Sequence, residues 1–162
     1  MNKAFLLLGS NMGNKTENIQ QALDNISQAS VDIFLRSSLY ETEPWGVKEQ
    51  ATFLNQVISV ETTMQAHDLL SIILDIEKKL GRKRIVKWGE RIIDIDIIYF
   101  NNDIIVTKDL KVPHPEIQNR KFTLVPLVEI APDYLHPVLN IKNEELLKRC
   151  SDVSVVKKYS MN

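Results

Sequence analysis

The chain has 162 residues, of which 44% are hydrophobic and 25% are charged, and its formal net charge is -1. This length and composition predict one globular domain over residues 1–162 with a sizeable core. A near-neutral chain has no general bias toward nucleic acid or membranes, so anion binding must come from a local cluster of cations. The single cysteine, Cys150, is expected to be a packed thiol, and with no targeting or membrane-spanning segment in sight it indicates a cytoplasmic protein.

The N-terminal part of the chain predicts a strand followed by a helix. The apolar run 4–8 ends at Gly9 and is typical of a buried strand that feeds a turn. Asn14 with Glu17 three positions later resembles a capping pair, and apolar residues recur at helical spacing to about residue 29.

Two more strands and a second helix are expected next. A strand runs from residue 31 toward residue 40, a loop covers 41–50, and the alternation over 53–61 predicts a central strand. A wide apolar stripe over 66–80 predicts a helix, and Gly81 lies where a C-cap glycine belongs.

The rest of the chain predicts a further strand, short helices and a hairpin. We expect a strand over 92–100, a hairpin turn over 101–103 into residues 104–106, a stiff extended segment over 112–115, and short helices over 124–130 and 144–150. The order of elements indicates an α+β sandwich of the split βαβ kind, with helices on one face of a mainly antiparallel sheet. The other face would then be free for ligands.

The segment RKRIVKWGERIIDID, residues 82–96, carries the strongest chemical pattern. Asp94 and Asp96 alternate on a strand, so their side chains point to one face, roughly 7 Å apart. Such a pair needs a positive partner, and Mg²⁺ bound through carboxylates and substrate phosphates suits it. The alternative is a solvated pair neutralised by Arg or Lys. Five cations precede the aspartates: Arg82, Lys83, Arg84, Lys87 and Arg91.

The basic segment and several single residues can each be interpreted as functional or as purely structural. Arginines bracketed by Gly81 and Gly89 can form a lid that grips phosphates, or a solvated loop. His114 lies between two prolines and could donate to a phosphate oxygen or serve only in a turn. Phe53 and Asn55 share a strand face and could read a flat heterocycle, although aromatic residues are most often core.

Two other functions are compatible with parts of the sequence. Residues 9–16 fit a phosphate-binding P-loop except that Asn14 replaces its second glycine, so a capped strand-to-helix turn is the alternative. A sheet with an open face and an arginine loop could also bind RNA, but the RNP-type aromatic motif and a basic charge are absent. A P-loop ATPase would release ADP.

Many short motifs together resemble the hydroxymethyl-dihydropterin pyrophosphokinase family of folate biosynthesis, from about residue 4 to about residue 132. They are Leu8-Gly9-Ser10-Asn11 with Gly13, Tyr40-x-Thr42-x-Pro44, Phe53-Leu54-Asn55, Leu80-Gly81-Arg82 with Arg84, Trp88-Gly89-x-Arg91, Asp94-Ile95-Asp96-Ile97 and Val112-Pro113-His114-Pro115. The segment before the aspartates departs from the family pattern at Lys87, Glu90 and Ile92.

This resemblance implies a ferredoxin-like α+β fold and transfer of pyrophosphate from ATP to the hydroxymethyl group of the reduced pterin, with release of AMP. It implies two Mg²⁺ ions on Asp94 and Asp96, with ATP and pterin as the partners. Separately, we expect no nucleic acid or membrane partner, and a monomer.

The resemblance also implies roles for single residues. The pterin would contact Gly9, Thr42, Pro44, Trp45, Phe53, Asn55 and Phe122. The ATP side would comprise Glu77, Arg84, Trp88, Arg91, Ile97, His114 and Arg120. Catalysis would rest on Arg82, Arg84, Arg91, Asp94 and Asp96.

Overall fold

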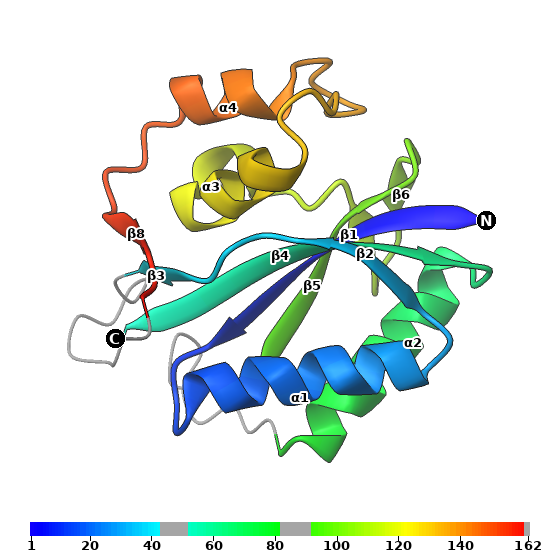
Figure 1. The fold of residues 1–162 in the computed structure, drawn as a ribbon. Coiled ribbons are helices and arrows are strands. Elements are labelled where there is room, and N and C mark those ends of the chain that lie inside the picture. The colour runs from blue at the N-terminus through cyan, green and yellow to red at the C-terminus, as the bar shows by residue number, and fades with distance from the viewer. Residues whose placement is uncertain (43–51, 82–91, 161–162) are drawn as a thin grey trace.

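The protein is described by a computed structural model, which covers residues 1–42, 52–81 and 92–160. Figure 1 shows a twisted sheet with α1 and α2 on one side and α3 and α4 on the other. The elements are β1 (Asn2–Ser10), α1 (Lys15–Gln28), β2 (Asp32–Arg36), β3 (Tyr40–Thr42), β4 (Phe53–Thr62), α2 (Ala66–Lys79), β5 (Asp94–Phe100), β6 (Ile105–Val106), β7 (Lys111–Val112), the 3-10 turn η1 (Ile117–Asn119), α3 (Lys121–Ile130), α4 (Asn143–Arg149) and β8 (Val156–Lys158).

The main sheet has the order β5-β1-β4-β3-β8, and β2 also pairs with β4. Each of these pairs is antiparallel, and β4 is the central strand, as predicted. The α+β class with a mainly antiparallel sheet is therefore confirmed. A P-loop needs a parallel sheet, whereas β1 is antiparallel to both of its neighbours, so residues 9–16 form a strand-to-helix turn instead.

One face of the sheet is covered by α1 and α2, and both helices have the predicted ends. The Asn14 side chain caps α1 by accepting a hydrogen bond from the Glu17 N–H at 3.2 Å. Gly81 follows α2 with a φ of 84°, a left-handed conformation that glycine adopts without steric cost. The core between these helices and the sheet consists of aliphatic residues such as Leu8, Ile58 and Ile73.

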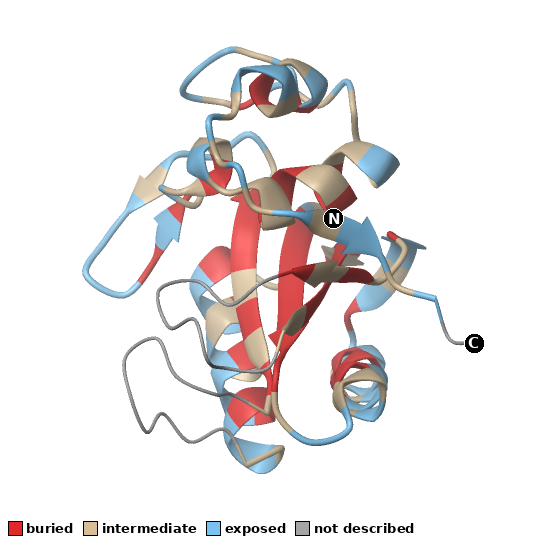
Figure 2. Ribbon diagram, turned by 90° about the vertical axis from the view of Figure 1, so that its left-hand side faces the viewer, coloured by how far each residue is buried: buried red, intermediate tan, exposed pale blue. Residues whose placement is uncertain are grey.

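The second face of the sheet is also covered, so the expectation of an open face is wrong. Phe5, Val57 and Tyr99 form a second core with Leu124 and Leu127 of α3. Figure 2 shows buried residues through the strands and on the helix sides that face them. The segment KFTLVPLVEI of α3 is apolar nearly all round, so its sequence does not indicate which face it covers. An RNA-binding module would need this face free.

Three other details differ from the expectation. The turn at Asn101 forms, but β6 pairs with β7 rather than with β5. The strand expected from residue 31 toward 40 is divided into β2 and β3. A register shift in the β1–β5 pair turns Tyr99 toward α3, whereas strict alternation along the strand predicts that Tyr99 points to the face away from Asp94 and Asp96.

The last strand, β8, was missed because three residues give no recognisable period. Among the described residues, none of the helices is both long and apolar enough to cross a membrane.

A buried hydrogen-bond network holds α4 against the second core. Asn143 is fully buried; its Oδ1 accepts from the Tyr99 hydroxyl at 2.7 Å and its Nδ2 donates to the Ala131 carbonyl at 2.9 Å. We expect Asn143→Ala to lower the free energy of unfolding by about 2–4 kcal/mol, because two buried polar partners are left unsatisfied. Urea unfolding measures this. Asn119→Ala, at an exposed position, should change stability by less than about 0.5 kcal/mol.

Candidate active site

The register of the sheet places the predicted residues in one row. Gly9 on β1 pairs with Asn55 on β4 on one side and with Asp94 on β5 on the other. Asn55 in turn pairs with Tyr40 on β3. Neighbouring strands are about 4.8 Å apart, so the backbones of Asp94 and Asn55 lie about 10 Å apart. The four positions share one face because paired residues in a sheet point the same way.

Gly9 lies in the middle of this row, and the Asn55 amide occupies the space where a Gly9 side chain would begin. A Cβ atom at Gly9 would lie 2.6 Å from Asn55 Nδ2. That contact is too short for any side chain, whereas Asn55 Nδ2 now donates to the Leu8 carbonyl at 3.3 Å. The absence of a side chain at Gly9 therefore makes room for the Asn55 amide, which lies against β1.

Two buried oxygen atoms in this region have no hydrogen-bond partner among the described residues. They are Asn55 Oδ1 and Thr42 Oγ1, and both residues are less than 5% exposed. Thr42 pairs with Phe53, the next residue along that face of β4 from Asn55. Buried polar atoms are nearly always hydrogen-bonded, so this pair of oxygens is typical of a site that binds a polar ligand.

Asp94 and Asp96 lie on the same face of β5, and both are half-buried. The backbone between them is bonded to α2: Glu77 is buried, and its Oε2 accepts from the Ile95 N–H at 2.7 Å. In the structure Glu77 therefore fixes the strand that carries both aspartates. The described residues contain no group of three or more acidic, histidine or cysteine side chains that could form a protein-only metal site.

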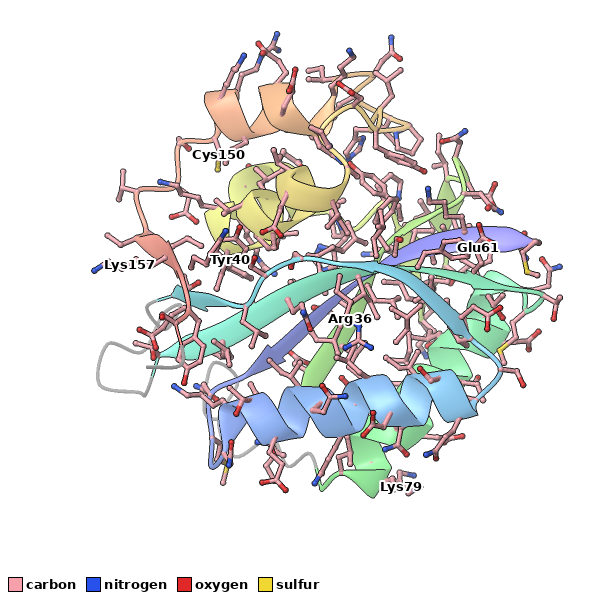
Figure 3. All side chains as sticks on the ribbon, viewed as in Figure 1. Arg36, Tyr40, Glu61, Lys79, Cys150 and Lys157 are labelled. Carbon is pink, nitrogen blue, oxygen red and sulfur yellow. The ribbon has the colours of Figure 1, made fainter. Side chains whose placement is uncertain are left out.

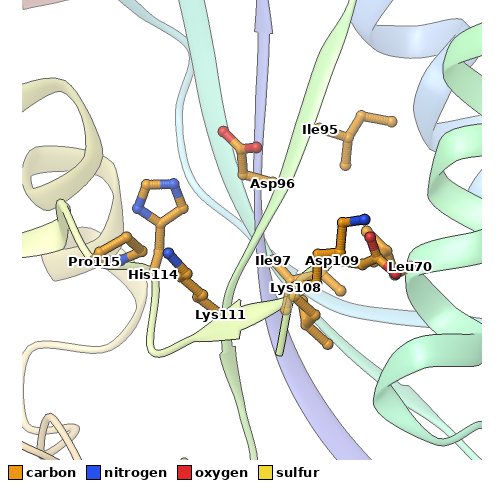
Figure 4. Close-up of a pocket in the computed structure, with 10 residues that line it drawn as sticks. Leu70, Ile95, Asp96, Ile97, Lys108, Asp109, Lys111, His114 and Pro115 are labelled. Carbon is orange, nitrogen blue, oxygen red and sulfur yellow. The ribbon is translucent and has the colours of Figure 1, made fainter. Parts of the chain in front are cut away.

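A pocket of about 240 Å³ lies against the outer edge of β5. Asp96 and Ile97 line it from the strand, Leu70 from α2, and His114 from the segment after β7. Figure 4 shows Asp96 and His114 reaching into it, with Lys111 below the imidazole. In the described main sheet β5 is an edge strand, and two of its backbone groups are bonded outside the sheet: the Ile95 N–H donates to Glu77 and the Ile98 carbonyl accepts from the His114 N–H. Two predicted ATP-side residues, Ile97 and His114, thus meet in one pocket.

His114 is fixed in one tautomer by its surroundings. Its Nδ1 accepts from the Glu116 N–H at 3.1 Å, so the ring proton is on Nε2 and available to donate. Burial, assisted by the positive charge of Arg120, lowers the pKa of His114 from its usual 6.5 to about 4. The ring is therefore neutral at physiological pH.

Arg120 and Phe122 flank the first residue of α3. The Arg120 guanidinium carbon lies 5.7 Å from the centroid of the Phe122 ring, a cation–π contact, and both side chains are half-buried. Arg120 Nε is buried without a hydrogen-bond partner among the described residues. One predicted ATP-side residue and one predicted pterin-side residue thus project from the same helix end.

Sequence reasoning missed the residues that connect α3 to β3. Glu129 accepts from the Ser38 N–H at 2.9 Å, from the Ser38 hydroxyl, and from the Tyr40 hydroxyl. Burial and then the bond to Glu129 raise the pKa of Tyr40 to about 12. Burial alone would raise the pKa of Glu129, but these hydrogen bonds lower it. Glu129 and the residues that donate to it are about 90 positions apart, so no local sequence pattern predicts these hydrogen bonds.

Six predicted site residues lie outside the described ranges: Pro44, Trp45, Arg82, Arg84, Trp88 and Arg91. Their roles, and the lid expected between Gly81 and Gly89, stay predictions.

With the geometry established, comparison with known proteins identifies the family. A sequence model described as 7,8-dihydro-6-hydroxymethylpterin-pyrophosphokinase matches residues 5–132. The fold and the match define an α+β transferase of the pyrophosphokinase class. More particularly, the chain belongs to the 7,8-dihydro-6-hydroxymethylpterin-pyrophosphokinase family, which confirms the resemblance seen in the sequence motifs.

Individual relatives agree with this assignment. The 2-amino-4-hydroxy-6-hydroxymethyldihydropteridine pyrophosphokinase of Aquifex aeolicus is 41% identical over 138 residues, covering 85% of this chain and 86% of the relative. The folic acid synthesis protein FOL1 of Dictyostelium discoideum is 41% identical over 147 residues, which are 90% of this chain but 22% of FOL1. This chain therefore spans about a fifth of that longer protein.

A solved structure shows the same fold. The crystal structure of wild-type Plasmodium falciparum HPPK-DHPS superposes with a TM-score of 0.74 at 20% identity, over 92% of this chain and 43% of that chain.

The electrostatics of His114 make a prediction for both NMR and stability. At pH 7 we expect a neutral ring protonated at Nε2, which long-range ¹H–¹⁵N spectra of labelled protein would show. Because the pKa in the folded state is below its unfolded value, the stability tied to His114 is fully present above pH 6.5 and is lost toward pH 4. His114→Gln should therefore flatten the fall in unfolding free energy over that range. An imidazolium signal at pH 6 would contradict this assignment.

Proposed function

We propose that this chain transfers the pyrophosphoryl group of ATP to the hydroxymethyl group of 6-hydroxymethyl-7,8-dihydropterin, and that the transfer takes place over Gly9. The new bond joins the hydroxymethyl oxygen to the β-phosphorus, the bond from that phosphorus to the α-phosphate oxygen breaks, and AMP and a proton leave. The observation that carries this proposal is the row Asp94, Gly9 and Asn55, which sets a carboxylate and a buried amide on the two strands that flank a residue without a side chain.

The donor set of Asp94 and Asp96 fits Mg²⁺. Magnesium binds through one or two carboxylates together with substrate phosphates, and rarely in a protein-only cage. Two half-buried aspartates without a third described acidic or histidine ligand match that preference. We propose two ions, as in the family resemblance; when bound with ATP they would neutralise phosphate charge. The protein's part is to hold the carboxylates in place through β5 and Glu77.

We place ATP in the pocket against the edge of β5. Leu70 and Ile97 supply apolar contact for a flat base beside the edge strand β5. His114 Nε2 is free to donate to a phosphate oxygen, and the neutral ring does so without losing its proton. Arg120 supplies positive charge from the start of α3. Phosphoryl-type transfer depends mainly on such alignment and charge stabilisation.

We place the pterin between β3, β4 and α3. Asn55 Oδ1 and Thr42 Oγ1 lack partners among the described residues, and a pterin edge carries donors and acceptors that would satisfy them. Phe53 and Phe122 supply aromatic surface for the ring. The hydroxymethyl group would then extend along the row past Gly9 toward the aspartates. The single-domain organisation, the monomeric state and the cytoplasmic location remain predictions of the sequence.

Removing either aspartate should stop turnover without unfolding the protein. We expect Asp94→Ala and Asp96→Ala each to lower kcat by at least about a hundredfold, since metal-assisted charge stabilisation is worth several kcal/mol. The measurement is pterin-dependent AMP release, with circular dichroism to check the fold. Asp103→Ala, in the exposed turn after β5, is the matched control and should retain wild-type activity. Near wild-type rates in both site variants would disprove the proposal.

A methyl group at Gly9 should weaken the binding of the pterin. We expect Gly9→Ala to displace the Asn55 amide and to weaken pterin binding about tenfold or more, the effect of disturbing one buried hydrogen bond. Calorimetry with 6-hydroxymethylpterin in the presence of a non-hydrolysable ATP analogue and Mg²⁺ measures this. The affinity of the same variant for the ATP analogue alone is the internal control and should change less than threefold. Unchanged pterin affinity would place the pterin elsewhere.

A further inference from the structure

The C-terminal segment lies beyond residue 132, where the match to the family model ends, yet it packs against the elements of the proposed site. After α4 the chain runs past α3 to β8, which pairs with β3 (Figure 1). Figure 3 shows Cys150 at the end of α4 and Lys157 on β8, near Tyr40 of β3. We call residues 152–159 the strap. It contacts α3 at one end and β3 at the other.

Asp152 supplies the cap that α3 lacks. The N-cap residue of α3, Arg120, makes no side-chain capping bond. Instead Asp152, which lies 31 positions further along the chain, accepts a hydrogen bond from the N–H of Lys121 with its Oδ2 at 3.0 Å. The first N–H groups of a helix have no partner within the helix, and a carboxylate there also interacts favourably with the helix dipole. The start of α3 is therefore fixed by the strap.

The Asp152 carboxylate is itself held in one orientation. Its Oδ1 accepts from the Ser154 N–H at 2.9 Å and from the Ser154 hydroxyl at 2.6 Å. Burial opposes the charge, but these bonds and the bond from Lys121 lower the pKa of Asp152, so it is ionised at neutral pH. Both carboxylate oxygens thus have defined partners.

The other end of the strap fixes β3. Val156 pairs with Thr42, and Lys158 pairs with Tyr40. The N–H of Tyr159 then donates to the Leu39 carbonyl at 2.8 Å, just before β3 begins. A strand of only three residues has few hydrogen bonds of its own, so this added strand stabilises the position of Thr42.

We propose that the strap sets the spacing between α3 and β3, and that Asp152 is a positioning residue for Arg120 and Phe122. These two residues flank Lys121, whose N–H the carboxylate holds, and Thr42 lies on the strand that the strap pairs with. The inference rests on the proposed function, because it assigns the pterin to the space between these elements.

The main test compares variants at Asp152 in the full chain at a temperature well below their melting points. Asp152→Ala removes the acceptor for the Lys121 N–H, and we expect KM for the pterin to rise about tenfold and kcat to fall, since Phe122 and Arg120 both move. Asp152→Asn keeps one of the two oxygen acceptors, and Asn caps helices about as well as Asp, so its KM should lie between those of wild type and Asp152→Ala. Asp133→Ala, with a side chain 77% exposed, is the matched control and should match wild type.

Hydrogen exchange in the absence of substrates separates this inference from the proposed function. In Asp152→Ala, amides 121–123 should exchange faster, while those of β1 and β4 keep wild-type protection. If wild type makes no AMP but these amides respond, the proposed function fails and the strap remains. Wild-type KM and kcat in Asp152→Ala, or equal losses in Asp152→Asn and Asp152→Ala, would overturn the positioning role.

If Asp152→Ala does not fold, Ser154→Ala takes its place in the test. That variant removes only the hydroxyl that orients the carboxylate, and it should raise KM for the pterin about threefold. An unchanged KM there would overturn the role of Asp152.

Discussion

The site depends on the antiparallel register of β1 with its two neighbours. Gly9 pairs with Asn55 and with Asp94, which are 46 and 85 positions away from it along the sequence. This pairing places the amide and the carboxylate on one face of the sheet. A shift of one residue in either pair would turn the amide or the carboxylate to the opposite face. The buried β1, β4 and β5 side chains of both cores oppose such a shift, so the hydrophobic pattern also determines the chemistry.

Carboxylates with structural roles support the residues that face the substrates. Glu77 holds β5 from behind, Glu129 connects the end of α3 to Ser38 and Tyr40, and Asp152 caps its start. Each accepts at least one backbone N–H, an interaction that stabilises the ionised form. The aspartates of β5 differ in that their half-buried face is directed toward the candidate site. Some carboxylates thus support the fold and others face the candidate site. A chain of nearly neutral net charge can therefore place a few charged residues together at that site.

Local sequence cues predicted elements whose causes are local. The Asn14 cap, the Gly81 helix end and the alternation in β4 depend on residues within a few positions of one another, and all three are confirmed. The open sheet face was predicted wrongly because α3 contains Pro126 and lacks an amphipathic pattern. Pairing of β6 with β7 instead of β5 was equally unpredictable, since two-residue strands carry almost no signal.

The sequence by itself determined the family, the α+β class and the identity of the metal-binding candidates, because motifs and hydrophobic periods are properties of neighbouring residues. Only the tertiary structure decided that the second face is covered, that Asp94 and Asn55 lie on the two strands beside Gly9, and that the C-terminal strap reaches α3. Those features arise from contacts between residues far apart in the chain. Strand register and helix docking bring such residues together through the packing of the whole core, which no short stretch of sequence specifies.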